Sequence, residues 1–379
     1  MLKFKAIPFY ILSVNKEDVM IKRANVKLMA LSIGLFFSFS THAEDGVYVI
    51  EAGHPSLKEF LLPATPPSPT DNPWTQVKAD LGKQLFFDPR MSGTGQVTCA
   101  SCHFPERGWE DGLTTAVRFG GKVMQLASPT IINIGYNTIY MWDGRMPSLE
   151  KQAFVGQGLK ADINAGMEEQ GLKEGHHIER IKMVKGYQTA FAKAFPQEPA
   201  EAQISRDTIA KAIASFERTV ISNNSSFDAW VKGDKNAMTA QQINGFKVFI
   251  GKGICVACHS GPNFTDNGFH NLGLKSFGAT DHHKGRMAQK PAHTSTDGAF
   301  KTPTLRDIAL RAPYFHDGSA KNLMEVVEHY DRGGDIKTNI SLMMQSGLGL
   351  SKDEKLNLVS FLEALTSPTK PFVYPVLPQ

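Results

Sequence analysis

The sequence predicts a mainly α-helical protein of two similar small domains, each built around its own Cys-x-x-Cys-His motif. The chain contains two such motifs, 156 residues apart, and they account for all four cysteines among its 379 residues. Apolar residues recur at helical spacing in several segments, whereas the alternating pattern typical of strands is scarce. The length suits two domains of ordinary size.

The first 43 residues have the pattern of a Sec-type export signal. A basic stretch (22–27) precedes an apolar stretch (28–40), and Ala43 closes a small-residue cleavage site. Charged residues before Met20 serve no export purpose, so Met20 is the expected start. We expect cleavage, with an uncleaved N-terminal anchor as the alternative. The mature protein is then located in the periplasm or at the cell surface and is not integral to the membrane.

The charge balance gives no reason to expect a nucleic-acid partner. Six of the 41 basic and two of the 37 acidic residues lie in 1–43, which leaves 35 of each in the mature chain. A formal net charge of zero without a run of Lys or Arg does not attract polyanions.

The expected organisation after the signal follows from composition. Residues 44–73 form a Pro-rich leader, and residues 367–379 form a Pro-rich tail that wraps the surface without regular structure. Between them we expect an N-terminal domain over 74–203, which contains the first motif, and a C-terminal domain over 204–366, which contains the second.

Two segments give clear helix signals. In DTIAKAIASFERTVI, one face carries the apolar positions Ile209, Ile213, Phe216 and Val220. In SKDEKLNLVSFLEALT, Ser351 is the expected N-cap and Glu354 occupies the capping-box position. The buried stripe of that second helix is Leu358, Phe361, Leu362 and Leu365.

The two motifs have the spacing of covalent haem attachment. Two thiols three positions apart reach the two vinyl groups of one haem, and the following His becomes the proximal iron ligand. The residues concerned are Cys99, Cys102 and His103 for the first haem, and Cys255, Cys258 and His259 for the second. A thioredoxin-like redox pair needs no His and belongs to a βαβ pattern, and a zinc site needs no His after both pairs.

Longer segments around these motifs match a known family. They include LGKQLFFDPRMSGTGQVTCASCH, MWDGRMPSLEKQA, GFKVFIGKGICVACHSGPNFTD and FKTPTLRDIALRAPYFHDGSAKNLMEVVEHYDRGG. In these segments the chain resembles the bacterial di-haem cytochrome c peroxidases and, more closely, the MauG-type enzymes. The resemblance covers roughly residues 75–366 in family order.

The resemblance implies that the first haem reacts with hydrogen peroxide. Conventional members block this haem with a distal His about twenty residues after the first cysteine. Here Phe119 stands at that place, and no His lies between His103 and His176. An iron with one axial ligand leaves an open position for peroxide, as in MauG-type members. Met124 is the alternative ligand for that position.

The resemblance also implies a tyrosine ligand at the second haem. Conventional members place a Met fourteen residues after the His of the FHDG segment, and here that count runs from His316 to Tyr330. A phenolate oxygen stabilises ferric over ferrous iron, and MauG-type members use such His-Tyr ligation. The alternatives are a buried core tyrosine with His329 or a nearby Met as the ligand.

Two further residues match family positions near the haems. Trp142 matches the tryptophan between the haems, where an indole can relay an oxidising equivalent, and Gln152 matches the distal-pocket glutamine. The usual acid–base Glu is missing, because its position reads Gly166 just before Met167. The acids that can substitute for it are Asp162, Glu168 and Glu169. A missing acid–base group slows peroxide turnover by ~10²–10⁴.

The sequence leaves open whether this chain binds the calcium ion that the family has between its haems. The Asn that binds it is replaced by Ala127, while the backbone carbonyls of Arg311 and Pro313 remain as candidate calcium ligands. Four histidines in a Gly-rich loop are expected to be exposed loop residues rather than a metal site. They are His270, His282, His283 and His293.

The expected function is peroxide-driven oxidation of an electron-rich side chain, a Trp, in a partner protein, which in some relatives is a copper-binding surface protein. Two alternatives stay open: a conventional cytochrome c peroxidase supplied by a small redox protein, and a non-catalytic electron-transfer or sensor cytochrome. Trp109 and Trp230 either pass oxidising equivalents to the surface or simply pack.

Overall fold

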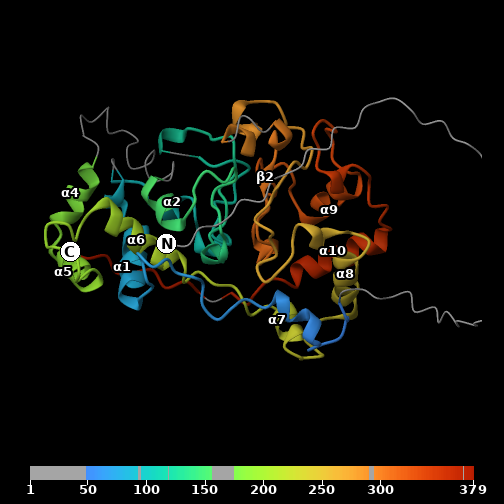
Figure 1. The fold of residues 1–379 in the computed structure, drawn as a ribbon, viewed down its shortest axis with the longest axis horizontal. Coiled ribbons are helices and arrows are strands. Elements are labelled where there is room, and N and C mark those ends of the chain that lie inside the picture. Colours follow the sequence, from blue (N-terminus) through green and yellow to red (C-terminus); the bar gives the residue numbers. More distant parts are fainter. Residues whose placement is uncertain (1–47, 93–94, 118, 156–174, 290–293, 370) are drawn as a thin grey trace, which may run out of the picture. The chain divides into compact units, whose positions relative to one another are not determined.

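Helices make up most of the regular structure in the computed structural model of the chain (Figure 1). The structure describes residues 48–92, 95–117, 119–155, 175–289, 294–369 and 371–379. All of these residues belong to one compact unit, Val47–Gln379. The predicted signal peptide (1–43) lies outside the described residues. The predicted mainly α-helical class is confirmed.

The helices pack into two separate cores. The first core contains α1 (Gln76–Phe86), α2 (Leu149–Val155), α4 (His176–Lys182), α5 (Lys185–Ala194) and α6 (Arg206–Glu217). The second contains α7 (Ser226–Val231), α8 (Ala240–Ile250), α9 (Leu323–Asp331) and α10 (Lys352–Glu363). Two short antiparallel strands, β1 (Phe269–His270) and β2 (Phe300–Lys301), pair Phe269 with Lys301 and His270 with Phe300.

The two cores repeat one packing device. Helix α1 crosses α6, and helix α8 crosses α10. At both crossings a glycine lets the backbones approach, because a Cβ at Gly82 or at Gly245 would lie 1.9 Å from a carbonyl oxygen of the opposite helix. No side chain fits there. The repeat supports the interpretation of two similar helical domains.

The helix signals of the sequence are confirmed. Helix α6 buries Ile209, Ile213 and Phe216. Helix α10 begins after Ser351, whose hydroxyl and the side chain of Glu354 form the expected capping box. Leu358, Phe361 and Leu362 of this helix are buried, and so is Leu365, which follows its end.

The observed cores divide the chain at a different point from the predicted boundary at 203/204. Helix α6, which the prediction places in the second domain, packs on α1 and α2 in the first core. Val220 also belongs to that core. The first core therefore extends past α6, and the helices α7 to α10 belong to the second.

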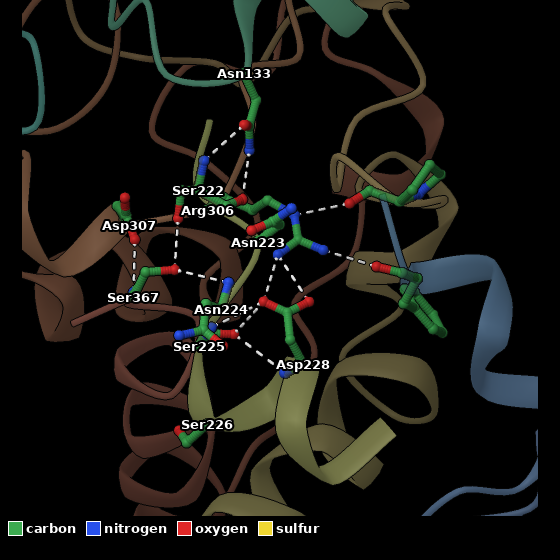
Figure 2. A network of polar contacts seen from close by, with 12 residues as sticks. Asn133, Ser222, Asn223, Asn224, Ser225, Ser226, Asp228, Arg306, Asp307 and Ser367 are labelled. Atoms are coloured by element: carbon green, nitrogen blue, oxygen red, sulfur yellow. Dashed lines mark hydrogen bonds and ion pairs between the residues drawn. The ribbon is translucent and has the colours of Figure 1, made fainter. Parts of the chain in front are cut away.

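A buried ion pair joins distant segments of the second core (Figure 2). The Arg306 guanidinium donates to both carboxylate oxygens of Asp228 at 3.0 and 2.9 Å, and to the Phe60 carbonyl at 2.7 Å. Its Nε donates to the Pro262 carbonyl at 2.8 Å. A buried pair of this kind is stabilising only when its remaining hydrogen bonds are satisfied, as they are here. It connects the leader, α7 and the loop after the second motif.

Residues 371–379, called the tail segment below, lie against the first core without helix or strand. Arg90 donates to the Pro378 carbonyl at 2.8 Å. The Lys83 ammonium lies 4.5 Å from the centroid of the Phe372 ring. In the part of the chain that the structure describes, no helix is long and apolar enough to span a membrane.

Candidate functional site

Both Cys-x-x-Cys-His motifs fold into the same local structure. Cys99–Ser101 and Cys255–Ala257 each form one turn of 3-10 helix, closed by a hydrogen bond from the second cysteine to the first. The first Cys of each motif begins the turn, the second Cys ends it, and the His follows directly. The geometry fits covalent attachment of one haem at each motif.

The two motif histidines are oriented by equivalent hydrogen bonds. His103 Nδ1 lies 3.1 Å from the carbonyl oxygen of Trp109, and His259 Nδ1 lies 2.9 Å from that of Phe264. The two residues whose carbonyls accept these bonds, Trp109 and Phe264, both have left-handed backbone angles, with φ of 62° and 51°. An Nδ1–H donated to a carbonyl leaves Nε2 available for a metal and fixes the ring.

Burial keeps these imidazoles neutral. It lowers the pKa of His103, and it lowers the pKa of His259 to about 4. The neutral imidazole is the form that binds metal. Burial also raises the pKa of Cys255 to about 12, so this side chain is a thiol before haem attachment.

A largely apolar cavity in the second core brings most of the predicted site residues together. Its predicted members are Trp142, Cys255, Cys258, His259, Arg311, Pro313 and Tyr330. Apolar side chains complete the walls, among them Phe249, Leu323, Val327 and Leu362. An apolar cavity with two thiols, one imidazole and one phenol is the donor chemistry that a covalent haem requires.

Among the alternatives for the second axial ligand, the geometry disfavours His329. Its Nε2 lies 2.8 Å from the Leu272 carbonyl, and its Nδ1 lies 3.0 Å from the Arg332 guanidinium. Both nitrogens are already hydrogen-bonded, whereas Tyr330 of α9 lines the cavity. Burial raises the pKa of Tyr330. Met343 and Met344 line the same cavity and remain as alternatives.

Trp142 is one of the residues that line this cavity. Its indole N–H donates to the Ala127 carbonyl at 3.0 Å, and its own carbonyl accepts from the Lys301 backbone at 2.8 Å. The ring centroid is 6.4 Å from that of His316. One hydrogen bond therefore orients the indole, and the other fixes the backbone of Trp142 against β2.

Lys301 and Glu110 also line the cavity, and sequence reasoning missed both. Lys301 is buried, and burial lowers its pKa to about 8. A buried cation suits a haem, whose propionates are anionic. No local sequence signal marks Lys301, because its position depends on the pairing of β1 with β2.

Glu110 forms a buried ion pair with Arg311, at 3.3 Å. Burial raises the pKa of Glu110 to about 7, although Arg311 acts in the opposite direction. Arg311 also donates to the Thr304 carbonyl at 2.6 Å. Arg311, whose carbonyl is a predicted calcium ligand, thus carries a cationic side chain. This side chain neutralises the Glu110 carboxylate.

The loop histidines differ from the expectation of exposure. His283 is 7% exposed, and its ring centroid lies 5.7 Å from that of His316. His270 is paired with Asp266 at 2.8 Å. His283 is therefore buried and His270 is half-buried, although the Gly-rich sequence of the loop predicted exposed side chains. The side chain of His282 and all of His293 lie outside the described residues.

The distal side of the first haem is described only in part. Gln152 lies on α2 and is half-buried, and Met124 lies in a loop whose backbone bonds to Ala116 at 2.7 Å. The Phe119 side chain is outside the description. So is the segment that contains the acid–base candidates Asp162, Gly166, Met167, Glu168 and Glu169.

The mass of the denatured protein tests whether haem is covalently attached at both motifs. Denatured mature protein is expected to retain two haems, one on each Cys pair. The double variant Cys255→Ser/Cys258→Ser is expected to retain one, and Cys99→Ser/Cys102→Ser is its matched control. Mass spectrometry and pyridine haemochrome absorbance measure the count. Fewer than two covalent haems in the wild-type protein would falsify the attachment scheme.

Comparisons with known proteins show which family the chain resembles. Residues 76–236 match the family model described as di-haem cytochrome c peroxidase. A methylamine utilization protein MauG of Methylorubrum extorquens is 40% identical over 319 residues, which cover 84% of this chain and 86% of that protein. A cytochrome c551 peroxidase of Nitrosomonas europaea is 33% identical over 363 residues, covering 95% and 96%.

A solved structure gives the same result at the level of the fold. A MauG-like protein associated with microbial copper homeostasis superposes with a TM-score of 0.71 and 30% sequence identity. The match covers 81% of this chain and 95% of that one.

Proposed function

The chain belongs to the di-haem cytochrome c peroxidase family, which makes it an oxidoreductase with two c-type haems, and we propose that it uses hydrogen peroxide to oxidise a tryptophan of a partner protein. The observation that supports this MauG-like function over ordinary peroxidase function is the position of Tyr330 in the cavity with Cys255 and Cys258. Each haem, when bound, supplies an iron that can be oxidised and reduced.

Tyr330 would favour the oxidised state of the second haem. The phenol is neutral in its buried cavity, and losing its proton there requires a nearby positive charge such as ferric iron. An anionic oxygen ligand in turn stabilises the more highly charged iron. His259 would hold the same haem through Nε2, because its Nδ1 is already bonded to the Phe264 carbonyl.

Trp142 would serve as the relay between the two haem sites. Its indole N–H donates to the Ala127 carbonyl, and Trp142 lines the cavity in the second core. An indole loses an electron far more easily than an aliphatic or phenyl side chain, so it can accept and pass on an oxidising equivalent. Gln152 would contact peroxide on the distal side of the first haem, as its family position implies.

The expected location and partner follow from the same membership. A predicted signal peptide places the protein in the periplasm or at the cell surface. One solved relative is associated with microbial copper homeostasis, which supports a copper-binding protein as the partner. Incubation with peroxide and the candidate partner, followed by peptide mass spectrometry, is expected to show oxidation at a Trp of that partner.

Access to the first haem is expected without prior reduction. The resting oxidised protein should show one high-spin haem and bind one cyanide, because Phe119 offers no lone pair to iron. Phe119→His is the matched variant, and it should convert that haem to a blocked, low-spin form. Electron paramagnetic resonance and a cyanide titration measure both states. Two low-spin ferric haems in the wild-type protein would contradict the open position.

A conventional peroxidase remains the second candidate, because a cytochrome c551 peroxidase is 33% identical over most of both chains. It would take electrons rapidly from a small reduced cytochrome or cupredoxin. Rapid, saturable oxidation of such a donor by peroxide would favour this function. Failure of the wild-type protein to react with peroxide would instead favour a redox sensor, in line with Gly166 at the usual position of the acid–base Glu.

Calcium binding at Arg311 and Pro313 would depend on backbone carbonyls alone. Ala127 offers no side-chain oxygen, and its carbonyl already accepts from Trp142. Calcium prefers several oxygen ligands, including carboxylates, yet Glu110 is neutralised by Arg311. We expect extensive dialysis against a chelator to leave both haem spectra unchanged. Loss of the second haem's spectrum on dialysis, restored by added calcium, would show a required ion.

A further inference from the structure

An aromatic path leads from the first motif to the molecular surface. The carbonyl of Trp109 accepts from His103, the predicted proximal ligand, at 3.1 Å. The Trp109 indole packs edge-on against Phe372 of the tail segment, with centroids 5.2 Å apart. Phe372 in turn packs against Tyr374, at 5.1 Å. A single phenyl ring therefore separates the indole of Trp109, whose carbonyl binds His103, from a tyrosine.

Tyr374 has the two features that a surface electron-transfer residue needs. It is 53% exposed, so a molecule outside the chain can reach its ring. Its hydroxyl donates to the carboxylate of Glu106 at 2.8 Å. A phenol must lose its proton when it loses an electron, and a carboxylate within hydrogen-bond distance can accept that proton.

The tail segment is fixed in place for this role. Arg90 binds the Pro378 carbonyl, and the Lys83 ammonium covers the Phe372 ring. Phe87 supports both aromatic residues of the tail, with centroids 5.2 Å from Phe372 and 5.3 Å from Tyr374. The contacts between rings are thus built from α1, the first motif's loop and the tail together.

The second core contains a similar arrangement that lacks the indole. Phe264, whose carbonyl accepts from His259, packs against Phe60 at 5.4 Å, and Phe60 packs against Tyr48 at 5.3 Å. The Tyr48 hydroxyl is hydrogen-bonded to Glu59. The residue equivalent to Trp109 is therefore a phenylalanine, which is not oxidised under the same conditions. The chain provides its own internal control.

We propose that Trp109, Tyr374 and Glu106 form an electron-transfer path by which an aromatic donor outside the chain, a phenol or an indole, reduces the first haem domain. The proposal rests on the proposed reaction with peroxide. It adds the point on the surface where the donor delivers its electrons.

Electrons pass along this path one at a time, and each electron that leaves Tyr374 is accompanied by a proton. When the peroxide reaction has removed an electron from Trp109, Tyr374 supplies an electron to the indole and its phenolic proton passes to Glu106. Tyr374 is left as a neutral radical and Glu106 as a carboxylic acid. The external donor then gives one electron to Tyr374, and Glu106 returns the proton. Two such cycles, with two protons from solvent, reduce one peroxide to two waters.

The test uses the holoprotein with peroxide and a spin trap. In the wild-type protein a trapped radical is expected on the peptide containing Tyr374, together with a tyrosyl signal in freeze-quench electron paramagnetic resonance. Tyr374→Phe should remove both and lower peroxide-driven oxidation of a soluble phenol at least ~10-fold. Trp109→Phe should have the same effect, because it reproduces the arrangement of the second core.

Two further variants distinguish proton transfer from Tyr374 to Glu106 from an effect of altered side-chain packing. Glu106→Gln keeps the size of the side chain but cannot take up the phenolic proton, so the yield of the Tyr374 radical should fall. Tyr48→Phe, in the matched pair without an indole, should behave as the wild-type protein. Haem content is measured for each variant by pyridine haemochrome.

The outcomes distinguish this path from the proposed function. If peroxide is consumed but no adduct forms at Tyr374, or if Tyr374→Phe oxidises the phenol as fast as the wild-type protein, the path is wrong and the peroxide function stands. An equal loss of signal in Tyr48→Phe would also contradict it. If the wild-type protein consumes no peroxide, both the path and the proposed function fail.

Discussion

Tyr330→Met is expected to raise the reduction potential of the second haem by on the order of 0.1 V or more, within the roughly 0.8 V range that axial ligands span. A neutral, soft thioether stabilises ferrous iron, whereas an anionic phenolate oxygen stabilises ferric iron. The position is favourable for the exchange, because Tyr330 projects from α9 into the cavity and Met343 and Met344 already line it. Spectroelectrochemical titration measures the shift.

Tyr314→Phe is the matched control, because Tyr314 lines the same cavity and is buried but is not a predicted ligand. It should leave the potential of the second haem unchanged. Tyr330→Phe should give a second haem that binds cyanide, since no ligand replaces the phenol. An unchanged spectrum and potential in Tyr330→Met would mean that another residue, such as Met343 or Met344, binds the iron.

Trp142→Phe is expected to stop oxidising equivalents from reaching the Tyr330 haem while cyanide still binds at the first haem. Phenylalanine is far harder to oxidise than tryptophan, so the relay is lost and partner oxidation falls sharply. The swap also removes the hydrogen bond to the Ala127 carbonyl, which costs about 1–3 kcal/mol if the carbonyl is left unpaired. Stopped-flow absorbance at both haems after peroxide addition measures the effect.

A second tryptophan provides the control for that lost hydrogen bond. Trp74 donates its indole N–H to the Ser215 carbonyl at 3.1 Å and does not line the cavity in the second core. Trp74→Phe should therefore lower stability without altering communication between the haems. If Trp142→Phe transfers oxidation as the wild-type protein does, the relay role of Trp142 is wrong, even if peroxide chemistry survives.

Sequence reasoning succeeded where the determinants are local. The capping box of α10 involves Ser351 and Glu354, which are three residues apart, and it is present as expected. Each Cys-x-x-Cys-His motif likewise depends on one turn of chain. The count from His316 to Tyr330 identified a residue that the structure places in the cavity of the second motif.

Features that depend on distant segments could not be read from the sequence. The ion pair between Glu110 and Arg311 joins residues 201 positions apart. The packing of α6 on α1, which moves the boundary between the cores, is long-range in the same way. The contact between Trp109 and Phe372 depends on how the tail segment folds back onto the first core, and its prolines predicted only the lack of regular structure.

The reaction of the oxidised wild-type protein with one equivalent of hydrogen peroxide tests the central claim most directly. The account predicts that the absorption bands of both haems change together, that the change outlasts mixing by seconds or more, and that it decays as a Trp of the partner is oxidised. Absence of any spectral change with peroxide at any pH would contradict the account.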